Sequence, residues 1–417
     1  MHEHLTILGI ALVVLGYGYF SRLLNRYNIS GPMVFTAIGI LLSPLGIGTH
    51  PIHPDAEAIQ IVAEVALIVI LFSDAATIDL PHLRKEWRLP VRLLFVAMPL
   101  SILLSYLTAK LFFPDQPELY LLLLALILAP TDAALGKAVV SDPSIPETIR
   151  NTINVESGLN DGIAFPVLLT ILALLAGSGS GHGGESGPLA YIAQQILIGA
   201  LAGALVGWTG ARLGERALQR GWMEHQYRNL IPIALAIFAY YFAEHFGGNG
   251  YIAAFFGGLL LGNNSPALRE STEDFAESEG EFLIMVSFLV FGLVFVPAVV
   301  DYWDLRAWLY ALLSLTVLRM LPVALGFGFF KLDLPTRLFI GWFGPRGIAS
   351  ILYILVAVGE LGSIRGHETL YATAALTILL SILLHGLSAK PLAKLYARWV
   401  AKHPLQYGKK EPHDPTE

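Results

Sequence analysis

Long apolar runs separated by short polar segments fill this chain from its start to about residue 400. The runs are about twenty residues long and do not alternate between apolar and polar positions, which argues against the strands of a β-barrel. Helices of that length and polarity are what a lipid bilayer requires. The pattern predicts an all-α polytopic membrane protein with about thirteen transmembrane helices, at 5–24, 31–48, 57–76, 90–112, 118–139, 151–175, 190–211, 228–246, 249–263, 282–300, 304–330, 335–359 and 368–389.

Composition narrows the class further. Hydrophobic residues make up 55% of the chain and charged residues only 14%, whereas a soluble domain has roughly 25% charged residues. The net charge of −6 offers no basic surface for nucleic acid. The sequence has no P-loop and no HExxH or GxSxG motif, and its short polar tail leads us to expect no nucleotide-binding domain. We therefore expect a lipid bilayer as partner, neither nucleic acid nor nucleotide, no cofactor and no enzymatic activity.

An odd number of spans puts the two termini on opposite sides of the membrane. Most of the 26 Lys and Arg residues fall in the segments that would then face the cytoplasm, and only Lys110, Arg306 and Arg365 fall on the outer side. Because positive residues are retained on the cytoplasmic side, this asymmetry predicts an outer N-terminus and a cytoplasmic C-terminus. The first span is interpreted as a retained helix of a protein in the cytoplasmic (inner) cell membrane.

The fifth predicted span is interrupted by Pro130, Thr131 and Asp132. Proline removes a backbone donor and clashes with the preceding turn of a helix. Carbonyls freed by such a break, together with a carboxylate, are suitable ligands for a hard cation. The alternative is an ordinary proline kink beside a structural aspartate.

The sixth predicted span carries a polar face. At 100° per residue, Glu156, Ser157, Asn160 and Asp161 fall on one side of the helix, where they cannot face lipid. From the inner ends of their spans, Asp132 and Asp161 lie at depths of roughly 10 and 15 Å, so the two carboxylates can meet. A buried structural network is the alternative interpretation.

Two arginines and a second break complete the polar set. Arg319 lies near the middle of the eleventh span, and Arg346 follows Gly344 and Pro345, which should interrupt the twelfth. Arginine at membrane depth needs a partner, and Glu156 and Asp132 are the expected ones. Interrupted helices in matching positions of two halves predict two inverted repeats whose broken helices cross at the midplane.

A count of formal charges predicts the stoichiometry. Asp132, Glu156 and Asp161 contribute three negative charges, and Arg319 and Arg346 contribute two positive ones. The empty site then carries a net charge of −1 if all three acids are ionised. One Na⁺ or one H⁺ neutralises it, which predicts competition between them and electroneutral 1:1 exchange.

At these residues the sequence resembles the monovalent cation:proton antiporter superfamily, and within it the electroneutral sodium/proton antiporters of bacteria and archaea that are related to sodium/hydrogen exchangers. The pair Asn160–Asp161 resembles the electroneutral branch, and the resemblance extends over nearly the whole chain. It implies a homodimer in which 90–175 and 304–400 form a moving core. Residues 1–89 and 176–303 would form the scaffold and dimer contact, and 401–417 a short cytoplasmic tail.

The resemblance also implies roles for the site residues. Asp161 would bind Na⁺ and H⁺ alternately, with Ser157, Asp132 and the Thr131 carbonyl completing the coordination and Glu156 close to the ion. Glu156 would pair with Arg319, and Asn160 would steady the site. Arg346 would either counter the dipoles of the broken helices or hold Asp132. The transported ions would be Na⁺ or Li⁺, with K⁺ left open.

Other positions carry weaker expectations. Asp74 resembles an acidic position at the cytoplasmic mouth, and Glu64 is either a satisfied structural acid or a residue that senses pH or lines a scaffold cavity. Small residues allow close helix contact, so Gly158 and Gly162 predict such a contact on the sixth span. The glycine run at 199, 203 and 207 predicts helix packing and, more weakly, a dimer contact.

The resulting hypothesis is a Na⁺/H⁺ antiporter that works by alternating access and serves pH homeostasis. A K⁺/H⁺ or mixed exchanger on the same fold is the nearest alternative, because carboxylate and carbonyl oxygens suit both ions. A cation channel would need a continuous pore. An intramembrane aspartyl protease would use Asp132 and Asp161 as a dyad, but the two arginines within the spans fit an ion site better.

Overall fold

The computed structural model describes residues 2–48, 56–85, 87–176, 187–276, 280–328, 332–362 and 364–403. Within these ranges the chain forms helices and turns, and no β-strand occurs. Seven of the described helices are long and apolar enough to cross a membrane, and four shorter apolar helices accompany them. The all-α membrane class is therefore confirmed. The part of the predicted tail 401–417 beyond residue 403 lies outside the described residues.

Every predicted span coincides with helical structure. Two of them change helix type along their length. The fourth predicted span consists of α5 (Arg88–Arg92), the π-helical turn η1 (Leu93–Ala97) and α6 (Met98–Phe112). The tenth consists of α15 (Glu281–Val290), the π-helical turn η3 (Phe291–Phe295), α16 (Val296–Val299) and the 3-10 turn η4 (Val300–Tyr302). Short helices α4 (Leu80–Lys85), α11 (His225–Arg228) and α14 (Pro266–Phe275) lie in connections. The unbroken spans are α1 (His2–Arg26), α2 (Gly31–Leu42), α3 (Glu57–Thr77), α9 (Glu147–Leu175), α10 (Gly187–Gln219), α12 (Leu230–His245), α13 (Gly250–Asn264) and α21 (Glu368–Lys402).

Three predicted spans are interrupted. The two breaks expected at the prolines are present: α7 (Glu118–Ile127) is separated from α8 (Ala133–Val140), and α19 (Leu334–Trp342) from α20 (Ile348–Leu361). The eleventh span, expected as one helix, is instead divided at Thr316 into α17 (Leu305–Leu315) and α18 (Val317–Gly326). Thr316 has non-helical dihedral angles, and its hydroxyl donates to the Leu312 carbonyl one turn earlier.

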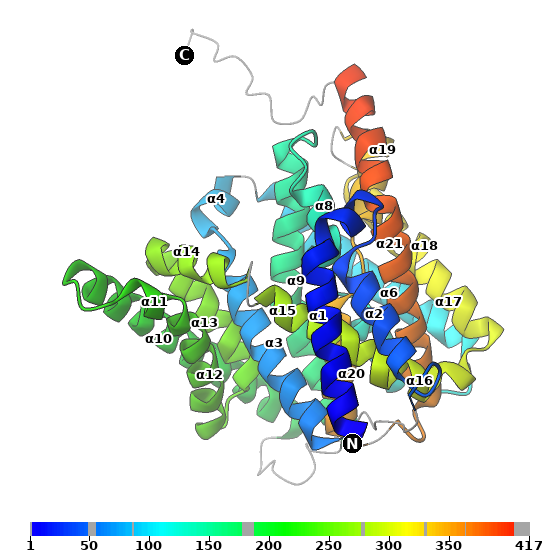
Figure 1. Ribbon diagram of the computed structural model, residues 1–417, viewed down its shortest axis with the longest axis horizontal. Coiled ribbons are helices and arrows are strands. Elements are labelled where there is room, and N and C mark those ends of the chain that lie inside the picture. The colour runs from blue at the N-terminus through cyan, green and yellow to red at the C-terminus, as the bar shows by residue number, and fades with distance from the viewer. Residues whose placement is uncertain are drawn as a thin grey trace.

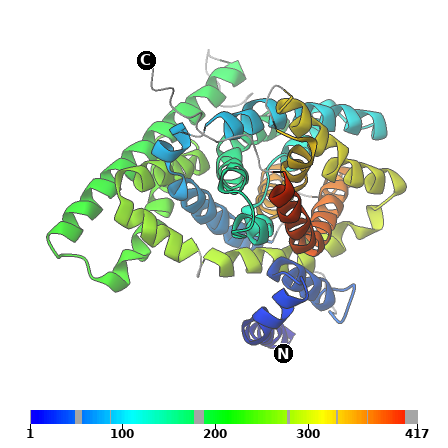
Figure 2. The ribbon, with the colours of Figure 1, turned by 90° about the horizontal axis from the view of Figure 1, so that it is seen from above.

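The helices form a broad bundle (Figures 1 and 2). Seen from above, α10 to α14 occupy one side and α17 to α21 the other, with α9 between them. The first two helices lie together at one edge, where the rings of Tyr17 and Phe35 meet edge to face at 5.4 Å. The start of α1 and the end of α21 lie at opposite ends of the bundle, as an odd number of spans requires.

A glycine seam joins α10, α13 and α3. A Cβ atom on Gly203 or Gly207 of α10 would collide with the backbone of α13 at Ala253 or Gly257. On its other side, α13 approaches the backbone of α3 at Phe72 through Gly258. The glycine run of α10 is therefore engaged in helix packing within the chain, which confirms the first of its two expected roles.

The glycines of α9 also lie in helix contacts, as expected. Gly158 faces Ile78 beyond the end of α3, with room for a Cβ atom at 3.5 Å from that side chain. Gly162 lies against the Phe255 ring of α13, where a Cβ atom would not fit. Close contact on this face leaves the polar face of α9 directed toward the two interrupted helices.

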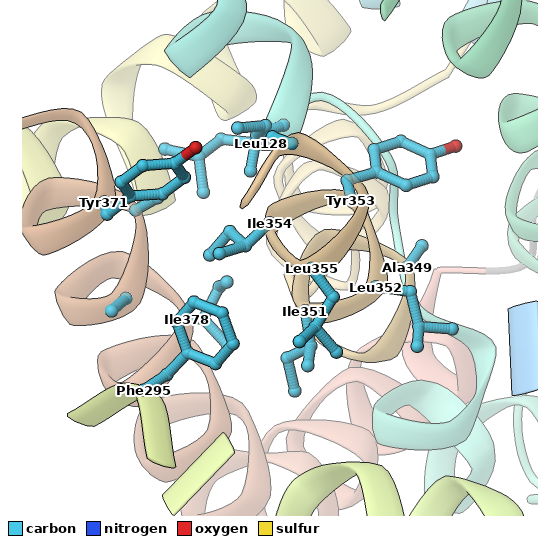
Figure 3. Packing of buried hydrophobic residues seen from close by; sticks show 14 of the residues in the cluster. Leu128, Phe295, Ala349, Ile351, Leu352, Tyr353, Ile354, Leu355, Tyr371 and Ile378 are labelled. Carbon is cyan, nitrogen blue, oxygen red and sulfur yellow. The ribbon is translucent and has the colours of Figure 1, made fainter. Parts of the chain in front are cut away.

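The second half of the interrupted twelfth span, α20, lies in the apolar centre of the bundle. Its residues from Ile348 to Val358 are buried on every side, which explains why it shows no polar face. Figure 3 shows Leu128, Phe295 and Ile378 packed around it. This packing fixes the position of the break that precedes α20.

Candidate functional site

The two chain breaks meet and bond to each other. The backbone N–H of Asp132, in the first break, donates to the Pro345 carbonyl of the second at 2.8 Å. In return, the backbone N–H of Ile348 donates to Asp132 Oδ2 at 2.7 Å. Ile348 is the first residue of α20, so Asp132 places a carboxylate at the N-terminus of that helix, where a negative charge is favoured.

Arg346 performs the complementary task at the end of α7. Its Nη1 donates to the carbonyl oxygens of Ala129 and Pro130 at 2.7 and 3.0 Å. These carbonyls lie in the break just beyond α7, near the negative end of the helix dipole, where a cation is favoured. The backbone N–H of Arg346 donates to Ser381 Oγ on α21 at 2.7 Å. Of the two roles expected for Arg346, this geometry supports the compensation of helix ends.

Glu156 and Arg319 form the expected buried ion pair. Nη2 of Arg319 donates to both carboxylate oxygens of Glu156, at 2.5 and 2.8 Å, and both side chains are 2% exposed. The guanidinium reaches this position because Gly344 has no side chain, and a Cβ atom there would lie 2.6 Å from Arg319 Nε. The glycine of the second break therefore serves the ion pair as well as the turn.

The Thr131 carbonyl is the centre of a small network at the first break. Ser157 Oγ donates to it at 2.8 Å, and Asn160 Nδ2 donates to it at 3.1 Å and to Thr131 Oγ1 at 2.8 Å. All three side chains are buried. The structure thus brings the predicted polar face of α9 against the predicted break, and oxygen ligands for a cation gather at this point.

A cavity of about 650 Å³ ends at these oxygens. Asp132 and Asp161 both line it, together with Ser157, so the two carboxylates meet in one cavity as expected. The lining continues to Asn25 at the end of α1 and to Lys390 of α21, toward the end of the bundle where α21 terminates (Figure 1). The site is therefore accessible from one end of the bundle.

The two accessory acids on α3 are placed differently. Asp74 lines the cavity and lies close enough to Asp132 and Asp161 to repel their charges. Glu64 lies ten residues earlier, roughly 15 Å away along the helix, and accepts a hydrogen bond from Tyr241 at 3.4 Å. Glu64 is not among the residues that line this cavity, and its bond to Tyr241 is typical of a satisfied structural acid.

One residue of the site was not predicted from the sequence. Tyr353 of α20 donates its phenolic hydrogen to Asp161 Oδ1 at 2.8 Å, and both side chains are buried. A buried tyrosine hydroxyl usually finds a hydrogen-bond partner. The available signal was therefore a single tyrosine within the apolar run 348–358. The sequence of this run does not indicate which residue on another helix would accept its hydrogen bond.

The oxygens at the end of the cavity form a set of possible cation ligands. Among the described residues, no group of three or more His, Asp or Glu side chains is arranged to hold a metal ion. The oxygens near the end of the cavity are two carboxylates, a hydroxyl and a backbone carbonyl, which suit a hard monovalent or divalent cation.

Comparison with known proteins agrees with this arrangement. Residues 9–395 match the family model described as the transmembrane sodium/hydrogen exchanger. A probable Na⁺/H⁺ antiporter of Schizosaccharomyces pombe is 25% identical over 72% of this chain and 41% of its own length. The K⁺/H⁺ antiporter NhaP2 of Shewanella oneidensis is 27% identical over 90% of this chain and 64% of its own. The chain thus spans between about two fifths and two thirds of the length of these curated relatives.

A solved structure has the same fold. The sodium/proton antiporter MjNhaP1 of Methanocaldococcus jannaschii, at pH 8, superposes with a TM-score of 0.76 and covers 95% of this chain and 100% of its own. The sequence identity is 21%, so the likeness concerns the path of the chain.

Proposed function

This chain belongs to the sodium/hydrogen exchanger family, and we propose that it is a secondary active antiporter that exchanges Na⁺ for H⁺ across the membrane. The family assignment confirms the resemblance drawn from Thr131–Asp132 and Asn160–Asp161. The observation that carries the proposal is the placement of Asp132 and Asp161 at the end of one cavity, where two interrupted helices meet. Such a site is typical of transporters, whose ion sites lie between broken helices.

Asp161 is the residue that exchanges Na⁺ and H⁺ in this proposal. A cation that reaches it through the cavity also meets Asp132, Ser157 and the Thr131 carbonyl. The Ser157 hydroxyl can keep its hydrogen on Thr131 and offer a lone pair to the ion, since a hydroxyl carries two lone pairs. Glu156 supports this site through Arg319, and Asn160 holds Thr131 in place.

Electroneutral 1:1 exchange is the proposed stoichiometry. The formal charge of −1, counted over the three acids and two arginines of the whole site, leaves room for one Na⁺ or one H⁺. Asp74 adds a further carboxylate to the cavity wall, so the count holds when Asp74 keeps one protonation state through the whole cycle. An Asp74→Asn variant should then still transport without moving net charge, whereas a variant that became electrogenic would contradict the count.

The cavity suggests which conformation is present. It extends toward the end of the bundle that the distribution of Lys and Arg assigns to the cytoplasm. We therefore interpret the conformation as inward-open, in an inner membrane, with the N-terminus outside. Residues 90–175 and 304–400 would move as inverted repeats against a scaffold that forms a homodimer.

K⁺/H⁺ exchange is the second candidate. Relatives named K⁺/H⁺ antiporters match about nine tenths of this chain at 27% identity. Oxygen ligands alone do not separate Na⁺ from K⁺, so the ion has to be identified by measurement.

Purified protein in liposomes with an internal pH dye tests the proposal. Na⁺, Li⁺ and K⁺ gradients are imposed with and without valinomycin, and Asp161→Asn is measured alongside the wild type. Asp142→Asn is the matched control, because Asp142 lies in the loop between α8 and α9 and bonds Ser144. We expect Na⁺-driven proton movement that Asp161→Asn reduces to background and Asp142→Asn preserves.

Each other outcome has a defined meaning. A response to K⁺ alone would keep the antiporter and change its ion. Proton movement that builds a membrane potential would contradict electroneutrality. If folded protein moved no protons with any cation, the antiporter proposal would fail, and the channel and protease hypotheses would return.

A further inference from the structure

Tyr353 contacts the carboxylate on which exchange is proposed to depend. Its hydroxyl lies 2.8 Å from Asp161 Oδ1, and it belongs to α20, so the bond links α9 to the second interrupted helix. Resting on the proposed function, we propose that Tyr353 is the positioning residue that holds Asp161 for the cation and sets how strongly protons compete with it.

Packing fixes the tyrosine ring in place, so its hydroxyl is held toward Asp161. Tyr353 is 0% exposed, and its ring packs at 4.9 Å against Phe165, which follows Asp161 by one turn of α9. In Figure 3 the Tyr353 hydroxyl points away from the apolar cluster that contains Ile354 and Tyr371. A donor held by packing loses little freedom when it forms its bond, because the ring has few rotamers to lose.

One bond from Tyr353 leaves Asp161 able to bind an ion. A carboxylate has about four lone-pair sites on two oxygens. Tyr353 engages Oδ1, while Asp161 also lines the cavity through which ions arrive. Tyrosine therefore fixes the orientation of the carboxylate without occupying it.

The charges around Asp161 explain why a neutral donor matters. Asp74 faces it from α3 and Asp132 from the first break, and both disfavour a further negative charge. The sequence of α13, which packs against α9 at Gly162, contains no charged residue. The two arginines nearby are engaged, one with Glu156 and one with the carbonyls at the end of α7.

Tyr353 thus supplies a neutral donor to a carboxylate that lies near two others. A hydrogen bond donated to a carboxylate stabilises its ionised form, which is the form that binds Na⁺. Loss of the hydroxyl should then favour the protonated form and make protons stronger competitors.

The test is Tyr353→Phe in the liposome assay, measured as Na⁺-driven exchange between acid and alkaline pH. The half-maximal point on the acid side should move to higher pH by about one unit, because a hydrogen bond to a charged group typically carries about a tenfold effect. The apparent KM for Na⁺ on the acid side should rise by about tenfold, while the maximal rate at alkaline pH stays close to that of the wild type.

Tyr371→Phe is the matched control. Tyr371 of α21 is equally buried, and its hydroxyl has no hydrogen-bond partner among the described residues. Removing it deletes the same atom from the same apolar region without touching Asp161. We expect its pH profile to coincide with that of the wild type.

The outcomes separate this inference from the proposed function. If the wild type exchanges ions but the profile of Tyr353→Phe is unchanged, the inference is wrong and the antiporter stands. Loss of exchange at every pH by folded Tyr353→Phe would also overturn it, because a purely structural requirement would then be shown. If wild-type protein shows no exchange, the proposed function itself fails.

A second substitution decides the matter if Tyr353→Phe does not fold. 3,5-Difluorotyrosine introduced at position 353 retains the ring and hydroxyl but makes the hydroxyl a stronger donor. The acid side of the profile should then move to lower pH, opposite to the Tyr353→Phe variant. An unchanged profile, or a shift to higher pH, would overturn the inference.

Discussion

Charges at the crossing of the two breaks and charges on the cavity wall are arranged in opposite ways. At the crossing, Arg319 holds both oxygens of Glu156, and Arg346 bonds the carbonyls at the end of α7. On the cavity wall, Asp161 and Asp74 lie near each other, and a neutral tyrosine supplies the donor. Bonded charges stabilise a fold, whereas crowded carboxylates have affinity for a cation.

The comparison makes stability and transport separable. Substitution at the crossing should destabilise the fold, because it leaves a buried charge or acceptor without its partner. Substitution of a cavity carboxylate should leave the fold intact, since it removes a charge that is costly to bury. Thermal unfolding of purified protein in detergent measures the first effect, and liposome transport measures the second.

Glu156→Gln should have the largest effect on stability. It leaves the guanidinium of Arg319 buried with a neutral partner, and breaking a buried pair typically costs about 3–5 kcal/mol. Glu64→Gln makes the same chemical change at a site with a weaker bond to Tyr241 and should cost less than about 1 kcal/mol.

A double variant sharpens this prediction. Arg319→Met combined with Glu156→Gln should recover part of the lost stability, because the unpaired charge is removed. If Glu156→Gln alone unfolded at the wild-type temperature, the pair would not be holding the crossing together.

Ser350→Ala should have an intermediate effect. Ser350 Oγ donates to the carbonyl of Ile127, the last residue of α7, at 2.7 Å. Its loss leaves a buried acceptor at the end of a helix without this donor, at a cost of about 1 kcal/mol. Ser287→Ala is the control, because that hydroxyl bonds a carbonyl of its own helix, Leu283, and should cost less. Equal losses would show that the bond between the broken helices has no special weight.

Asp161→Asn should change stability least of the three, although the proposed function expects it to abolish exchange. The amide oxygen can still accept the hydrogen of Tyr353, and a buried charge is removed from a wall shared with Asp74 and Asp132. Unfolding should occur at the wild-type temperature or above it. A loss of stability comparable to that of Glu156→Gln would erase the distinction between the two regions.

Sequence patterns were sufficient for the features that leave a local signal. Pro130 and the Gly344–Pro345 pair interrupt apolar runs visibly, and both breaks are present. The polar face of α9 follows from helical spacing alone, and its residues do meet the first break. No such mark stands at Thr316, so the division between α17 and α18 was missed.

Features that depend on which helices become neighbours were harder to predict. Arg346 was expected either to counter the dipoles of the broken helices or to hold Asp132. In the structure its guanidinium bonds the carbonyls of Ala129 and Pro130. Tyr353 lies in a run that is otherwise apolar, so its sequence context resembles ordinary core. Its hydroxyl is recognised as part of the site only in the structure, because α9 places Asp161 within hydrogen-bond distance of it.

The seam of glycines between α10, α13 and α3 has a mechanical consequence. At these glycines, no side chain lies between the helices that could change rotamer to absorb a displacement. These three helices should therefore behave as a stiff frame. If one part of a transporter does not deform when an ion binds, the binding free energy can drive movement of the other part. A stiff frame would therefore couple ion binding to movement of the opposite bundle.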